Sequence, residues 1–155
     1  MGTKLRRMLD KHKNKLVTSI VEGLRASDAV HYQQLDAALL NERIEHLVAE
    51  FLDTMAGEGK GFTEFILRLT EERMAEGFEL TEIQTMLNTL DEQACDLALK
   101  HSDESKVDKH LVRICRTISL AKDELAYTYY LGKQSAESRL QELEGKREGA
   151  AEAAK

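Results

Sequence analysis

The fold is decided by residues 80–97, LTEIQTMLNTLDEQACDL, in which apolar residues recur at alternating spacings of three and four. The apolar series is Leu80, Ile83, Leu87, Leu90, Ala94 and Leu97. A second series in residues 107–128 has the same spacing and comprises Val107, Leu111, Ile114, Ile118, Ala121, Leu125 and Thr128. This spacing places each series on one face of a helix, and helices with such faces pack side by side at a shallow angle.

Outward from these two stretches, the remaining chain divides into further helical segments, and no proline interrupts them. We expect helices over about 4–24, 29–55, 62–76, 81–100 and from 106 to at least 132. The second of these should kink or break near Leu40 and Asn41, where its apolar register shifts. The sequence therefore predicts an all-α fold, a single-domain antiparallel bundle of about five helices that is globin-like or four-helix-bundle-like.

Glycines mark two of the expected connections. Three of the five residues from Gly57 to Gly61 are glycine, which predicts a loop. Gly77 follows the end of one periodic run, where a glycine adopts the left-handed conformation at little cost. We expect residues 1–132 to form a helical domain and residues 133–155 a charged tail, partly helical or disordered. Leu140 and Leu143 suggest further helix or the start of a coiled coil, and the alanine-rich end should fray.

Composition narrows the class of protein. The net charge of −6 argues against nucleic acid as the main partner, because phosphate binding needs a concentrated positive field. The basic cluster in the first helix is interpreted as a solvated face or a local docking surface, and comprises Lys4, Arg6, Arg7, Lys11, Lys13 and Lys15. No apolar run approaches the roughly 20 residues of a membrane span, and no secretory signal is expected. Two cysteines without a motif favour a reducing, cytoplasmic location.

Histidines and cysteines are the candidates for ligand chemistry. The chain lacks Glu-x-x-His, His-Glu-x-x-His and Cys-x-x-Cys patterns, so no metal or other cofactor is predicted. The alternative is a bundle that binds haem, a metal or a small apolar ligand, with His12 or His46 as the haem residue. Cys95 and Cys115 are interpreted as small buried hydrophobic residues. They could form a redox switch only if they lie close together across the last two helices.

No residue pattern supports a catalytic reaction, so we expect a protein that is not an enzyme. Neither cysteine nor any serine stands beside a recognisable base, and Gly57–Gly61 lacks the Lys-Ser/Thr of a phosphate-binding loop. The densest aromatic cluster is Tyr127, Tyr129 and Tyr130. Tyrosine is enriched at interfaces, so these residues are candidates for a dimer or partner surface. The alternative is ordinary bundle core with solvated hydroxyls.

Residues 72–83, ERMAEGFELTEI, join two helices through an Arg-x-x-x-Gly-aromatic-x-Leu turn. The segment resembles the N-terminal sensor domain of RsbR/RsbRD-type co-antagonists of the bacterial stressosome. A related turn also occurs in helical input domains of some sensor kinases. The resemblance covers about residues 1–132. It implies an all-helical domain that dimerises, binds no haem in its best-known members and passes a signal to a C-terminal output domain.

Three residues match the motif of that family, namely Arg73, Gly77 and Leu80. Arg73 could bind helix-end carbonyls or an acidic partner, and Leu80 is expected to be the first core position of its helix. Family members continue into a phosphorylatable domain or a kinase, whereas only a charged tail follows residue 132 here. We therefore expect a bacterial sensory or regulatory domain that acts by protein contact, as a homodimer or on a separate signalling protein.

Overall fold

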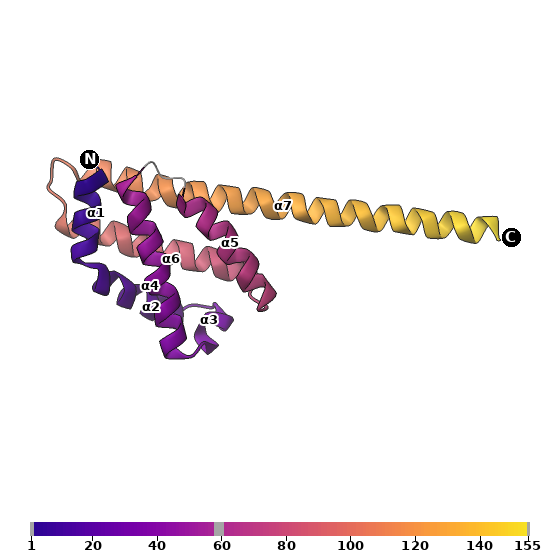
Figure 1. Ribbon diagram of the computed structural model, residues 1–155, viewed down its shortest axis with the longest axis horizontal. Coiled ribbons are helices and arrows are strands. Elements are labelled where there is room, and N and C mark those ends of the chain that lie inside the picture. The colour runs from indigo at the N-terminus through magenta and orange to yellow at the C-terminus, as the bar shows by residue number, and fades with distance from the viewer. Residues whose placement is uncertain (1, 58–60, 155) are drawn as a thin grey trace. The chain divides into compact units, whose positions relative to one another are not determined.

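The computed structural model describes residues 2–57 and 61–154. Over these residues the chain is helical and contains no strand, which confirms the all-α prediction (Figure 1). The helices are α1 (Gly2–Lys11), α2 (Lys13–Arg25), α3 (Val30–Gln34), α4 (Ala37–Ala56), α5 (Gly61–Ala75), α6 (Leu80–His101) and α7 (Val107–Ala153). Residues 58–60 of the predicted glycine loop lie outside the described residues, but α4 does end just before Gly57 and α5 begins at Gly61.

Two of the five expected helices are each divided in two. The first is interrupted at His12, where φ is −108° and ψ is 18°, and it continues as α2. The second does break, but at Leu35 and Asp36 rather than at Leu40 and Asn41, so that prediction is wrong by about five residues. Leu35 and Asp36 have extended backbones, with ψ of 143° and 138°.

The guanidinium of Arg25 accounts for the position of this second break. Its Nη2 donates to the carbonyl of Leu35 at 2.7 Å, and its Nη1 donates to the carbonyl of Gln33. These bonds satisfy the carbonyl groups that a helix end leaves without partners. Arg25 belongs to α2. The donors for these two carbonyl groups therefore come from outside α3, and they stabilise its end.

The core of residues 1–122 forms where α1 and α2 pack against α4 and α6. It contains fully buried side chains from all four of these helices, among them Leu5, Leu9, Leu16, Ile20, Leu24, Leu47, Phe51, Met55, Leu87 and Leu90. Gly23 allows a close approach of α2 to α6, because a Cβ there would lie 2.8 Å from Cγ2 of Thr89. The predicted apolar face of α6 is buried from Ile83 to Leu97.

The apolar face predicted for α7 is confirmed in its middle and wrong at its end. Ile114, Ile118, Ala121 and Leu125 are buried, whereas Thr128 is exposed. His110 and Thr117 share the buried face, although neither belongs to the predicted series. They are accommodated because Thr117 Oγ1 donates to the carbonyl of Arg113 at 2.9 Å and His110 Nδ1 lies 2.7 Å from Ser102 Oγ.

The chain divides into two compact units, residues 1–122 and residues 123–155. This division lies before the domain boundary predicted at residue 132. The predicted boundary stays a prediction. The second unit is helical as far as Ala153, and the fraying expected of the alanine-rich end stays a prediction. Among the described helices, none combines the length and the hydrophobicity that crossing a membrane requires.

Candidate functional site

The turn between α5 and α6 has the geometry that Gly77 predicts. Gly77 has a φ of +96°, which confirms the left-handed conformation expected there. The Gly77 amide donates to the carbonyl of Met74 at 3.0 Å, and the Phe78 amide donates to the carbonyl of Arg73 at 2.9 Å. These two bonds form a Schellman motif, in which the residue after the glycine packs back on the helix.

The side chain of Arg73 binds an acidic residue of its own turn. Its Nη1 lies 3.2 Å from Oε1 of Glu76 and 3.9 Å from Oε2 of Glu72. The guanidinium of Arg43 in α4 also binds both carboxylate oxygens of Glu76, at 2.9 and 3.1 Å. Glu76 thus joins two arginines and connects α4 to the end of α5. The turn at Gly77 is closed by the backbone carbonyl of Arg73 and not by the guanidinium of that residue.

The prediction that Leu80 is the first core position of its helix is wrong. Leu80 is half-buried, whereas Phe78 is buried and meets Tyr32 edge-on, with ring centroids 4.8 Å apart. Phe78 occupies the position of the Schellman motif that makes the hydrophobic contact, which explains why it enters the core. Of the three residues that match the family motif, two therefore shape this turn and one lies at its margin.

Glu82 is a buried carboxylate at this turn, and the sequence does not predict its role. Its carboxylate accepts hydrogen bonds from the His31 amide at 2.7 Å, from His31 Nδ1 at 2.7 Å and from the Glu79 amide at 2.9 Å. Burial opposes ionisation of Glu82, but these hydrogen bonds outweigh it and lower its pKa below the usual 4.5. The spacing of Glu79 and Glu82 is that of a capping box, whereas nothing in the sequence signals the contact with His31.

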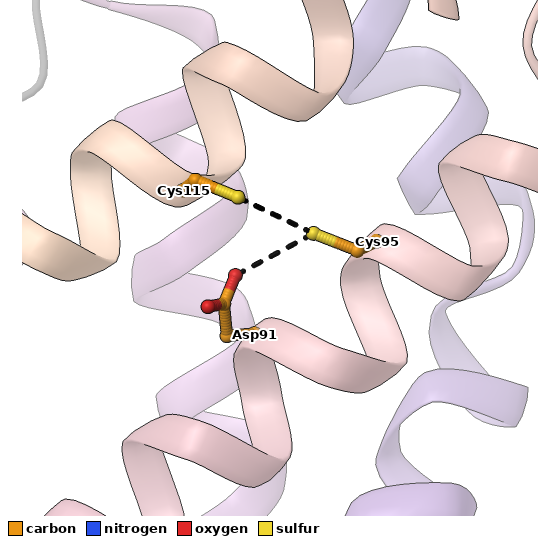
Figure 2. Close-up of side chains that lie close together, drawn as sticks. All are labelled: Asp91, Cys95 and Cys115. Carbon is orange, nitrogen blue, oxygen red and sulfur yellow. Dashed lines mark hydrogen bonds between the residues drawn. The ribbon is translucent and has the colours of Figure 1, made fainter.

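A second cluster joins α6 and α7 through both cysteines. The Sγ atoms of Cys95 and Cys115 are 3.7 Å apart, and Cys95 Sγ donates to Oδ1 of Asp91 at 3.5 Å (Figure 2). One ligand atom from each of the three residues lies within 4.8 Å of the others. The two helices thus bring together the cysteine pair on which a redox or ligand role depends. Burial, together with Cys115 and Asp91, raises the pKa of the Cys95 thiol.

The prediction that both cysteines are buried hydrophobic residues is wrong. Cys95 is half-buried and Cys115 is exposed. The preceding residues Ala94 and Ile114 are fully buried, and the next residue along a helix is rotated by about 100° from its neighbour. Each cysteine therefore lies at the margin of the core. Asp91 precedes Cys95 by four residues and so shares its helix face, which is the one sign of this contact in the sequence.

The three tyrosines lie in the unit formed by residues 123–155. The exposed fractions of Tyr127 and Tyr130 are 61% and 60%, and Tyr129 is half-buried. The Tyr130 hydroxyl accepts a hydrogen bond from Nε2 of Gln134 at 2.7 Å. Tyr127 and Tyr130 are thus not core residues of this chain. Their role in an interface stays a prediction.

The two histidines named for haem lie beside cavities with charged walls. His12 stacks on His101 with ring centroids 3.9 Å apart, and partial burial and His101 lower its pKa. The cavity there has a volume of about 420 Å³ and is lined by Lys4, Arg7, Lys11 and Lys106, among others. His46 is exposed, pairs with Glu50 at 3.6 Å and borders a cavity of about 500 Å³ whose walls include Glu42, Arg43, Arg68 and Glu72. Haem and small apolar ligands need mainly apolar walls, so these two cavities do not favour them.

Comparison of the chain with protein-family models, with curated proteins and with solved structures finds no match in any of the three. The case for a function therefore depends on the geometry above and on the sequence.

Proposed function

We propose that this chain is a non-enzymatic sensory or regulatory domain of the bacterial cytoplasm that acts by protein contact. Its contact surface is the part of α7 beyond Lys122, which pairs with a second copy of the chain as a parallel two-stranded coiled coil. The observation that carries this proposal is the exposure of Leu140 and Leu143, which is 59% and 63%. Every residue from 134 to 154 is exposed. A helix that carries apolar side chains and lacks tertiary packing is only marginally stable in water, so a partner helix would stabilise it.

The seam of the coiled coil follows a four-three spacing along the second unit. It comprises Ala126, Tyr129, Ala136, Leu140, Leu143, Ala150 and Ala154. Lys133 and Arg147 occupy the two inner positions that interrupt this series. Such polar residues select the register and the number of strands at some cost in stability. Ala136, Ala150 and Ala154 are exposed in the single chain and available to a second helix.

The charges that flank this seam favour a parallel pair over an antiparallel one. Arg139 and Lys146 lie on one flank, and Glu137 and Glu144 lie on the other. In a parallel pair, a residue of one flank meets the residue five positions later on the opposite flank of the second copy. Arg139 then faces Glu144. An antiparallel pair would instead bring acidic residues beside acidic ones and basic beside basic.

This register distinguishes among the three tyrosines. Tyr129 lies on the seam and Tyr130 on the acidic flank, whereas Tyr127 lies outside both. Two of the three residues predicted at the interface therefore fit the proposed dimer. Tyr127 remains free to contact a different signalling protein.

The oligomeric state of a matched pair of variants tests the proposal. Leu140→Asp places a charge on the seam, and Leu131→Asp places the same charge on the outer face at another exposed leucine. Sedimentation velocity over a concentration series should show a dimer for the wild type and for L131D, and a monomer for L140D. A wild-type monomer, or equal dissociation of both variants, would contradict the coiled coil.

Charge exchange tests the orientation. Arg139→Glu places two glutamates face to face at both symmetric contacts, so the dimer should weaken by roughly five-fold, about 1 kcal/mol for two pairs. The double variant R139E/E144R restores opposite charges and should recover the wild-type dissociation constant. If the double variant dissociates more than R139E alone, the parallel register is wrong.

A further inference from the structure

We infer that Asp91, Cys95 and Cys115 form a binding site for a thiophilic divalent cation, for which Zn²⁺ is the representative ion. All three residues belong to the unit of residues 1–122. The inference is therefore independent of the dimer proposed above. Figure 2 shows the three side chains pointing toward one another from two helices.

The first argument is the arrangement of the donor groups. Asp91 and Cys95 are four residues apart on α6, so their side chains lie one helical turn apart on the same face. Cys115 meets them from α7. Two helices thus supply two sulfur atoms and one carboxylate oxygen that converge within 4.8 Å. This donor set includes the ligand types that Zn²⁺ takes in proteins.

Two of the three distances between the donor atoms match a tetrahedral zinc site, and the third, between Cys115 and Asp91, is at most 4.8 Å. Zn–S bonds of about 2.3 Å and Zn–O bonds of about 2.0–2.2 Å require S···S edges of about 3.8 Å and S···O edges of about 3.5–3.7 Å. The Cys95–Cys115 Sγ separation is 3.7 Å, and Cys95 Sγ lies 3.5 Å from Asp91 Oδ1. A cation at the centre would therefore contact these groups with little movement of the helices.

The main alternative is a disulfide between the two cysteines, for which the sulfur atoms would have to approach from 3.7 Å to about 2.05 Å. The observation that favours the cation is the carboxylate of Asp91, because a disulfide makes no use of it. Among the residues that the structure describes, Asp91 has no ion pair, and its hydrogen-bond partner is the Cys95 thiol.

The chemistry of the donors selects the class of cation. Mg²⁺ and Ca²⁺ bind through oxygen ligands and rarely through sulfur, whereas thiolates favour Zn²⁺. Because Cys115 is exposed, the cluster is open to solvent, which can supply the fourth ligand. Binding of Zn²⁺ releases one proton from each thiol, and the two thiolates and the carboxylate then surround the ion.

Metal titration of the reduced full-length chain tests the site. Zn²⁺ is added in competition with a chromophoric chelator, and Co²⁺ provides a spectroscopic probe through its thiolate charge-transfer band. We expect one ion per chain. Cys95→Ser and Cys115→Ser should each weaken binding by on the order of 100-fold or more, and Asp91→Asn by about 10-fold, as losses around metal sites do.

Asp96→Asn is the matched control, because Asp96 lies on the same helix but pairs with Lys100 at 2.9 Å. It should bind Zn²⁺ like the wild type, and far-UV circular dichroism should show that every variant is folded. The site is refuted if the reduced chain binds no Zn²⁺, if C95S retains wild-type affinity, or if D96N weakens binding as much as D91N. The monomeric L140D variant should retain the site, which separates this result from the dimer test.

Discussion

Helix α6 and the last part of α7, residues 134–153, both carry leucines at four-three spacing, but buried leucines occur only in α6. In α6 the side chains of Leu87 and Leu90 are fully buried by other helices of the same chain. In the second unit Leu140 and Leu143 remain largely exposed. A four-three spacing therefore determines that a helix has an apolar face. It does not determine whether the face is covered within the chain or left for another molecule.

The largest expected effect comes from truncating the covered face. Leu87→Ala removes a fully buried side chain and should lower the free energy of unfolding by about 2–5 kcal/mol. The matched variant Leu143→Ala removes an exposed leucine and should change the stability of a monomeric L140D background by less than about 0.5 kcal/mol. Urea denaturation followed by circular dichroism measures both. A cost below about 1 kcal/mol for L87A would place the core elsewhere.

The next effect concerns the buried carboxylate at the start of α6. The hydrogen bonds from His31 and Glu79 hold the pKa of Glu82 below its value in the unfolded chain. Its contribution to stability is therefore present above about pH 4.5 and is lost as the pH falls through the lowered pKa of the folded state. Glu82→Gln should cost about 1–3 kcal/mol at neutral pH and flatten the stability curve below pH 4.5.

Acid titration of unfolding checks this expectation. The exposed Glu142 of the second unit provides the control, because Glu142→Gln removes a carboxylate that is not part of this cluster. A curve for E82Q that parallels the wild type down to low pH would show that His31 and Glu79 do not stabilise the ionised carboxylate.

The smallest effects should have opposite signs at two glycines. Gly77→Ala forces a Cβ into a left-handed residue with φ of +96°, and should cost about 1–2 kcal/mol. Gly145→Ala adds a Cβ that meets nothing within 4 Å on a helix, and should stabilise the helix by about 0.5–1 kcal/mol. Thermal unfolding of the first unit and helicity of the second report these changes. Stabilisation by G77A would mean that the turn is not constrained as described.

Much of the architecture follows from local pattern. The apolar faces of α6 and the middle of α7 could be predicted because a repeat of three and four residues has one geometric meaning on a helix. Gly77 was equally predictable, since a helix end often requires a left-handed residue and glycine adopts it most readily. Leu140 correctly indicated that helix continues beyond residue 132.

The errors occur where a residue of another helix supplies the decisive contact. The break at Leu35 depends on the guanidinium of Arg25, and Phe78 rather than Leu80 enters the core because Tyr32 meets it there. Neither contact leaves a periodic trace in the sequence, so apolar spacing alone predicts the break too late and predicts Leu80 instead of Phe78 in the core.

The sequence by itself determined that the chain is helical, where its main apolar faces lie and that Gly77 ends a helix, because each property depends on neighbours within a few residues. Only the tertiary structure decided which faces are covered. It also brought Asp91 and Cys95 of α6 within reach of Cys115, a residue of α7. Such a site depends on how two helices pack, and local spacing carries no information about the distance between side chains on separate helices.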